Sequence, residues 1–97
     1  MKTIDFKKMR TELKAIYKAF LENPEDESIK DKAQDYDREY GGLQAYENYL
    51  KDNPIPKNIS EALGGLFMIY EYGIFGENHD LSQENILKKV KPIYENL

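Results

Sequence analysis

Hydrophobic and polar positions along the chain follow helical spacing almost throughout. Between about residues 4 and 22, apolar residues recur every third or fourth position and form one stripe, with lysines on the opposite face. Such a stripe is typical of an amphipathic helix that buries one side. Thr3 or Asp5 can cap its start. Asn23-Pro24 is expected to end it, because proline disfavours a helical conformation in the residue before it.

A second helical pattern begins near residues 26–28 and extends to Leu43, again with apolar residues three or four positions apart. Gly41-Gly42 interrupts this pattern, and two adjacent glycines cost about 2 kcal/mol relative to alanine in a helix interior. We therefore expect a break or sharp kink at the two glycines, followed by a short helical segment over about 43–51.

The least charged stretch of the chain extends from Ile59 to Phe75, where Glu61 and Glu71 are the charged residues. Apolar residues cover almost the whole helical circumference, so this helix is expected to be buried on most sides at the centre of the fold. Asn58 is expected to cap its start, with Glu61 as the reciprocal partner of a capping box. The glutamates and internal glycines favour a core helix over a transmembrane one.

Gly64-Gly65 lies inside this central helix and indicates either the close approach of another helix or a locally soft helix. A last helix is expected to begin after Ser82, whose side chain is suited to the N-cap position. Pro92 lies inside the apolar pattern of that last helix, which is therefore expected either to kink or to end near Lys91.

These patterns predict an all-α fold with one domain over residues 1–97. We expect an antiparallel four-helix bundle, or five helices if the second is split at Gly41-Gly42. The chain has no cysteine, which excludes disulfides and a thiol nucleophile. No uninterrupted apolar run follows the N-terminal methionine, so we predict no signal peptide and a cytoplasmic location.

The formal net charge is −4 and is unevenly distributed. Residues 1–21 carry six basic and two acidic side chains, whereas residues 22–52 carry four basic and ten acidic ones. We predict no binding to nucleic acid, because that binding depends on neutralising phosphates. The acidic middle can attract a cationic partner. Its alternative interpretation is a solvated helix face, and the basic first helix is expected to pair with the second.

The sequence offers few groups for catalysis. His79 is the only histidine and lies in a predicted loop, where we expect it to be solvated, and the neighbouring Ser82 is better explained as an N-cap. The spacing of Glu77, Asn78 and Asp80 does not match a calcium-binding loop, and one histidine is poor support for zinc. We therefore predict no enzymatic activity, no catalytic residue, no metal, no cofactor and no small-molecule substrate.

The chain has eight tyrosines and no tryptophan. Tyrosine can bury its ring while its hydroxyl remains in water, and it is enriched in protein interfaces. The sequence leaves Tyr46, Tyr49 and Tyr72 equally open to a core and an interface role. The residues predicted to contact a protein partner are two carboxylates of the second helix and four tyrosines: Asp35, Glu39, Tyr46, Tyr49, Tyr72 and Tyr94.

The order of features resembles the immunity proteins of pediocin-like (class IIa) bacteriocins, of the enterocin A immunity type. The likeness lies in ELKAIYKAFLENPEDESI, in the apolar helix that follows, and in DLSQENILKKVKPI. The resemblance implies a non-enzymatic cytosolic protein that protects its host against a cognate bacteriocin. It would bind at the cytosolic side of the membrane receptor, a sugar-phosphotransferase permease.

The alternative is a small helical adaptor, of phage or plasmid type, that binds a basic partner protein through the acidic second helix. For either function we expect the contact surface around Gly41-Gly42 with Tyr46 and Tyr49. The competing surface is the C-terminal segment from Lys88 to Leu97.

Overall fold

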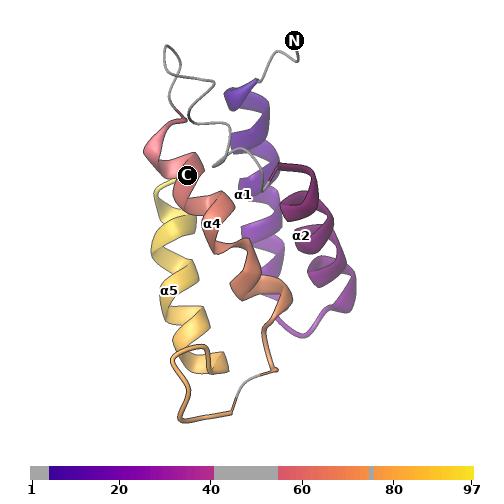
Figure 1. Cartoon of the computed structure of the whole chain (residues 1–97), viewed down its shortest axis with the longest axis vertical. Coiled ribbons are helices and arrows are strands. Elements are labelled where there is room, and N and C mark those ends of the chain that lie inside the picture. The colour runs from indigo at the N-terminus through magenta and orange to yellow at the C-terminus, as the bar shows by residue number, and fades with distance from the viewer. Residues whose placement is uncertain (1–4, 41–54, 75) are drawn as a thin grey trace.

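The computed structural model describes residues 5–40, 55–74 and 76–97. The helices within them are α1 (Phe6–Glu22), α2 (Glu27–Tyr40), α4 (Lys57–Tyr70) and α5 (Gln83–Glu95) (Figure 1). The predicted all-α four-helix bundle is confirmed for this part of the chain. Several sequence predictions lie outside the described residues: the Gly41-Gly42 break, the segment 43–51, Tyr46 and Tyr49.

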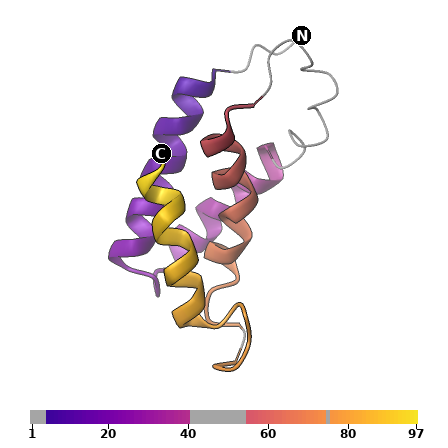
Figure 2. The ribbon, with the colours of Figure 1, turned by 90° about the vertical axis from the view of Figure 1, so that its left-hand side faces the viewer.

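Successive helices are antiparallel, and α1 and α4 form the central pair of the bundle (Figures 1 and 2). Each of these two packs against the other and against both α2 and α5. The helices α2 and α5 lie on opposite sides of this pair (Figure 1). The sequence predicted one central helix, whereas the structure has two, because the stripe of α1 is as deeply buried as that of α4.

The ends of α1 and the start of α2 follow local side-chain chemistry. Asp5 is the N-cap of α1 and accepts a hydrogen bond from the backbone N–H of Lys8 at 3.1 Å. The N–H of Asn23 closes the last turn, and the chain then turns into α2. At this turn Asp26 accepts hydrogen bonds from the N–H and hydroxyl of Ser28 at 2.9 and 2.7 Å. The bonds from Ser28 hold the pKa of Asp26 below its usual value.

Side chains from all four helices form the core. The largest of those that are fully buried are Leu13, Tyr17, Phe20, Leu66, Ile69, Ile86 and Val90. The expectation that α4 is apolar and buried nearly all round is only partly right. Phe67 is 37% exposed on its outer face, and Ile74, which follows the helix, is 69% exposed. A helix that packs on three neighbours in a four-helix bundle still has one face toward solvent.

The predicted capping box at the start of α4 is wrong. The helix begins at Lys57, two residues earlier than expected, with Pro56 as an N-cap that forms no side-chain hydrogen bond. Asn58 is therefore inside the first turn, and its amide donates to the carbonyl of Asn96 at 3.2 Å. Glu61 lies 3.9 Å from the ammonium of Lys57.

The far end of α4 and the path of α5 also differ from the expectation. The helix α4 ends at Tyr70, and Gly73 in the following turn has a φ of +88°, a conformation that glycine adopts without strain. Ser82 caps α5 as predicted, because its hydroxyl accepts from the N–H of Asn85 at 3.4 Å. The helix α5 continues through Pro92 to Glu95, so the predicted alternative of an end near Lys91 is wrong.

Candidate functional site

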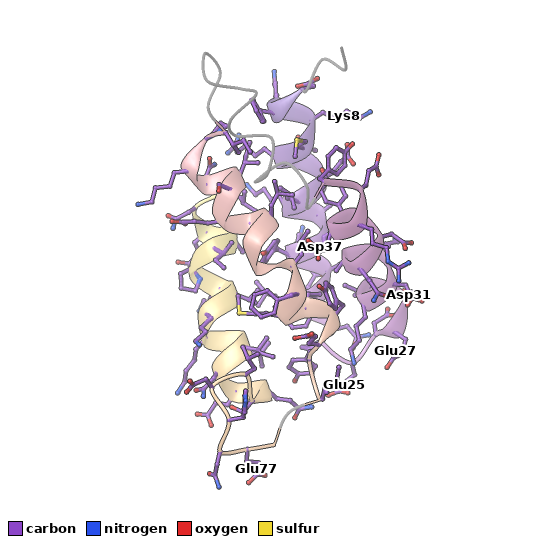
Figure 3. All side chains as sticks on the ribbon, viewed as in Figure 1. Lys8, Glu25, Glu27, Asp31, Asp37 and Glu77 are labelled. Atoms are coloured by element: carbon purple, nitrogen blue, oxygen red, sulfur yellow. The ribbon has the colours of Figure 1, made fainter. Side chains whose placement is uncertain are left out.

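The carboxylates predicted to contact a partner are on the solvent face of α2. Asp35 and Glu39 are both exposed, and with the exposed Asp31 they form a row of carboxylates four residues apart. Asp35 lies 4.0 Å from Arg38, but both side chains are more than 70% exposed, and such pairs contribute little. Figure 3 shows Glu27 and Asp31 at the outer edge of α2. We call Asp31, Asp35 and Glu39 the acidic row.

Asp37 is half-buried, unlike the exposed carboxylates next to it on α2. Its side chain lies toward α4 and accepts a hydrogen bond from the hydroxyl of Tyr70 at 2.9 Å (Figure 3). Burial, and then this hydrogen bond, raise the pKa of Tyr70 to about 12. Asp37 therefore joins α2 to α4 and is not part of the acidic row.

Tyr72 is a core residue. It is 6% exposed, and its ring meets the ring of Phe20 edge-on at a centroid distance of 5.3 Å. The ammonium of Lys30 lies 5.8 Å from the centre of the Tyr72 ring. The turn after α4 places Tyr72 against Phe20 of α1 and Lys30 of α2, which is the core position of the two that the sequence left open.

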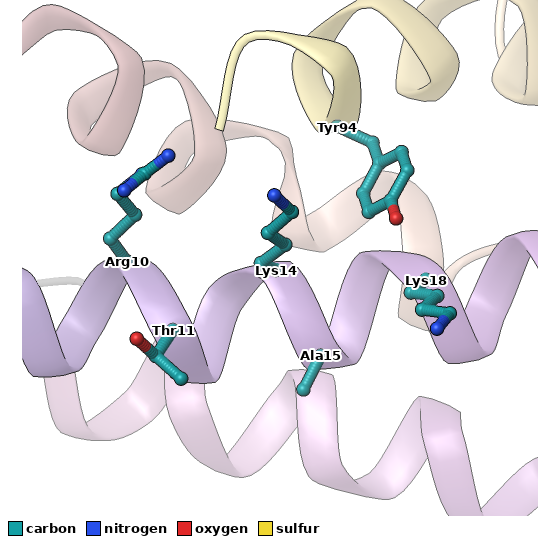
Figure 4. Close-up of a pocket in the computed structure, with 6 residues that line it drawn as sticks. All are labelled: Arg10, Thr11, Lys14, Ala15, Lys18 and Tyr94. Carbon is teal, nitrogen blue, oxygen red and sulfur yellow. The ribbon is translucent and has the colours of Figure 1, made fainter.

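Tyr94 is half-buried and lies beside a groove between α1 and α5. The groove has a volume of about 380 Å³. Its lining residues come from α1 and α5: Arg10, Thr11, Lys14, Ala15, Lys18 and Tyr94 (Figure 4). We call it the α1–α5 groove. The figure shows the Tyr94 ring projecting from α5 between Lys14 and Lys18.

The groove carries three cations and no carboxylate in its lining. Arg10, Lys14 and Lys18 are four residues apart, and each step rises about 6 Å along the helix. The ion pairs within the described residues each join two residues of one helix, and none involves Lys14 or Lys18. The expected pairing of α1 lysines with the second helix is absent from this part of the structure. Arg10 donates from Nε to the carbonyl of Leu97.

Sequence reasoning named Tyr94 as a contact residue and placed lysines on the polar face of the first helix, but it did not connect the two. The repeat of basic residues at positions 10, 14 and 18 is visible in the sequence and was a usable signal. The groove itself was not predictable, because it depends on α5 packing beside α1 rather than beside α2.

His79 has a structural role in the loop before α5. Its Nδ1 accepts a hydrogen bond from the N–H of Leu81 at 3.0 Å. Its carbonyl accepts from the N–H of Ser82 at 2.9 Å and from the amide of Asn85 at 3.2 Å. These bonds close the turn and position the N-cap. Within residues 5–40, 55–74 and 76–97, no three His, Cys, Asp or Glu side chains are grouped closely enough to hold a metal ion.

In comparisons with known proteins, no protein-family model, curated protein or solved structure matches the chain. None of the four helices described has the length and apolar character needed to cross a membrane. The acidic row and the α1–α5 groove are two charged surfaces with regularly spaced residues, and both are suited to recognise an oppositely charged partner.

Proposed function

We propose that this protein is a non-enzymatic cytosolic immunity protein, which protects its host against a cognate pediocin-like bacteriocin by binding at the bacteriocin receptor. The observation that carries the proposal is the antiparallel four-helix bundle, whose helices follow one another in the order on which the resemblance is based. The sequence segments that carry the resemblance coincide with α1 and the turn into α2, and with the capped start of α5.

The contact with the receptor is assigned to the exposed side of α2. Asp35 and Glu39 are exposed there and are held on a helix that packs firmly on α4. Opposite charges across an interface raise the association rate and fix the register of the partners. Tyr46 and Tyr49 follow α2 in the chain and would supply aromatic contacts, which often dominate the binding energy.

Expression in a bacteriocin-sensitive cell tests this function. The protein should confer resistance to one or a few peptides of a pediocin-like panel, and those peptides should keep their activity in the medium. The double variant Asp35→Lys with Glu39→Lys should lose protection. Glu77→Lys, a reversal in an exposed loop, should keep it. Unchanged sensitivity to the whole panel would refute the proposal.

The two tyrosines outside the described residues need their own test. Replacement of both Tyr46 and Tyr49 by alanine should abolish protection and leave the melting temperature nearly unchanged. A large drop in the melting temperature would instead show that both tyrosines are core residues. If protection survives in that variant but is lost on deletion of residues 93–97 from a still-folded protein, the contact surface is the C-terminal segment.

The acidic row favours a second candidate, an adaptor that binds a basic partner protein. Asp31, Asp35 and Glu39 repeat every four residues and are exposed, so they match a partner helix with basic residues at the same spacing. Binding of a lysine-rich helical peptide by the wild type and not by Asp35→Lys with Glu39→Lys would support the adaptor. It would replace the first proposal if protection is absent against every bacteriocin tested.

A further inference from the structure

We propose that the α1–α5 groove is a second binding surface, which takes an acidic helical segment of a partner protein. This surface lies on the side of the bundle opposite α2. The inference therefore goes beyond the proposed function and does not rest on it. Its failure would leave the immunity proposal intact, and failure of that proposal would not affect the groove.

The spacing of the cations points to a helix as the occupant. Arg10, Lys14 and Lys18 lie at about 6 Å intervals along α1. A helix aligned with α1 and carrying carboxylates at every fourth position presents negative charges at the same interval. Three charge pairs would then form in one register, whereas an irregular anion would satisfy fewer of them.

The two lysines of the groove are also not satisfied within the described structure, whereas Arg10 donates to the carbonyl of Leu97. Like charges four residues apart on a helix repel each other by a few tenths of a kcal/mol. Neither Lys14 nor Lys18 has an ion-pair partner among the described residues, and both side chains are exposed. An acidic segment in the groove would remove this repulsion, so charge complementarity favours that occupant.

The groove provides contact surface besides charge. Thr11 and Ala15 line it from α1 with short side chains, and the half-buried ring of Tyr94 projects from α5 (Figure 4). A recess between two helices can accept the side chains of a third helix that lies along it. The Tyr94 hydroxyl can donate a hydrogen bond to a carboxylate between Lys14 and Lys18.

The same observations disfavour the other anionic partners. Nucleic acids and anionic bilayers carry extended negative charge, which the ten acidic residues of positions 22–52 and the net charge of −4 repel. The surface of a bilayer is also flat and is therefore not complementary in shape to the groove. A second copy could offer its acidic row, but that contact joins opposite sides of the bundle and would generate open chains or larger rings rather than a closed pair.

Fluorescence anisotropy with a labelled helical peptide tests the proposal. The peptide carries glutamate at every fourth position on one face, and its control carries glutamine there. The full-length protein should bind the glutamate peptide and not the glutamine peptide. Affinity should fall as salt is raised from about 50 to 200 mM, because salt screens exposed charge pairs. The double variant Lys14→Glu with Lys18→Glu should weaken binding at least tenfold.

A matched control separates the groove from net charge. Lys32→Glu with Lys89→Glu makes the same charge change at two exposed lysines outside the groove, and it should alter affinity no more than twofold. Equal losses in the two double variants would overturn the proposal. If the glutamate variant does not fold, Lys14→Ala with Lys18→Ala replaces it and should still weaken binding several-fold.

Three further measurements distinguish the occupants. Tighter binding of single-stranded RNA, or of vesicles rich in anionic lipid, that depends on Lys14 and Lys18 would overturn the acidic-helix proposal. Self-association in sedimentation that the Lys14→Glu and Lys18→Glu changes abolish would make a second copy the occupant instead. A monomer that binds the peptide and neither the RNA nor the vesicles is the expected result.

Discussion

Tyr17 of α1 lies directly against Gly65 of α4, where the two central helices meet. A β-carbon on Gly65 would lie 2.5 Å from the Tyr17 hydroxyl oxygen. That hydroxyl is buried and donates to the carbonyl of Ala62 at 2.6 Å. The absence of a side chain at position 65 therefore leaves room for the Tyr17 hydroxyl, and the hydrogen bond of that hydroxyl joins α1 to α4.

Gly65→Ala should destabilise the protein by about 1–3 kcal/mol, because the added methyl group overpacks a buried contact. Ile93 and Met68 can shift at their flexible ends, but the rigid and hydrogen-bonded Tyr17 cannot. Gly64→Ala on the exposed side should instead stabilise by up to about 1 kcal/mol through helix propensity. Chemical denaturation of both variants measures the difference, and equal effects would contradict the close contact.

Tyr17→Phe provides a direct check of this contact. Alone it should cost about 0.5–1.5 kcal/mol, the net contribution of one hydrogen bond. Because phenylalanine lacks the oxygen that clashes with the new methyl group, Gly65→Ala should be less harmful in this background than in the wild type. Additive effects in the double-mutant cycle would show that the two residues do not interact.

The sequence was sufficient for features that depend on local chemistry. The stripe of α1, its Asp5 cap and the Ser82 cap of α5 follow from neighbouring residues alone, and the structure confirms each of them. Gly64-Gly65 correctly indicated a close helix. The sequence could not show that Gly65 is the glycine at this contact, or that the contacting residue is Tyr17, because both depend on how α1 packs on α4.

Features that depend on packing were misjudged or missed. Asn58 has the chemistry of an N-cap, but its contact with Asn96 becomes visible only once α5 lies beside α4. Asp37 lies among exposed carboxylates in the sequence, but in the structure its carboxylate turns toward α4 and accepts a hydrogen bond from Tyr70. In the same way, the cations of the α1–α5 groove acquire Tyr94 as a neighbour only in the folded bundle.

Leu66 and Phe67 should respond very differently to truncation, although they are adjacent and both apolar. Leu66 is fully buried, so Leu66→Ala should cost about 2–5 kcal/mol. Phe67 is 37% exposed, and Phe67→Ala should therefore cost clearly less. Urea denaturation of the two variants measures the contrast, and a similar loss at both positions would mean that the outer face of α4 is covered.

Tyr36→Phe should not destabilise the protein, in contrast to Tyr17→Phe. The Tyr36 hydroxyl is buried and has no hydrogen-bond partner among the described residues. A buried polar group without a partner carries a desolvation penalty of about 1–3 kcal/mol, so its removal should leave stability unchanged or raise it. Thermal melts of both phenylalanine variants provide the measurement. Destabilisation by Tyr36→Phe comparable with that of Tyr17→Phe would mean that its hydroxyl is hydrogen-bonded in solution.

Alkaline pH should unfold the protein through its tyrosines. Burial raises the pKa of Tyr17 and Tyr36, and burial with the bond to Asp37 raises the pKa of Tyr70 to about 12, whereas tyrosine in an unfolded chain ionises near pH 10. The folded state thus retains protons that the unfolded state has lost. Stability should be constant with respect to these groups below about pH 10 and should fall between about pH 10 and 12.

The tyrosinate absorbance and the helical circular dichroism signal should be followed in one titration. Because burial raises their pKa, Tyr17, Tyr36 and Tyr70 should ionise together with unfolding, when the helical signal is lost. Tyr17→Phe removes one of the groups with a raised pKa, so its stability should fall less steeply above pH 10. Full ionisation of every tyrosine near pH 10 with helicity unchanged would show that Tyr17, Tyr36 and Tyr70 are accessible to water, and the packing of α1, α2 and α4 described above would be wrong.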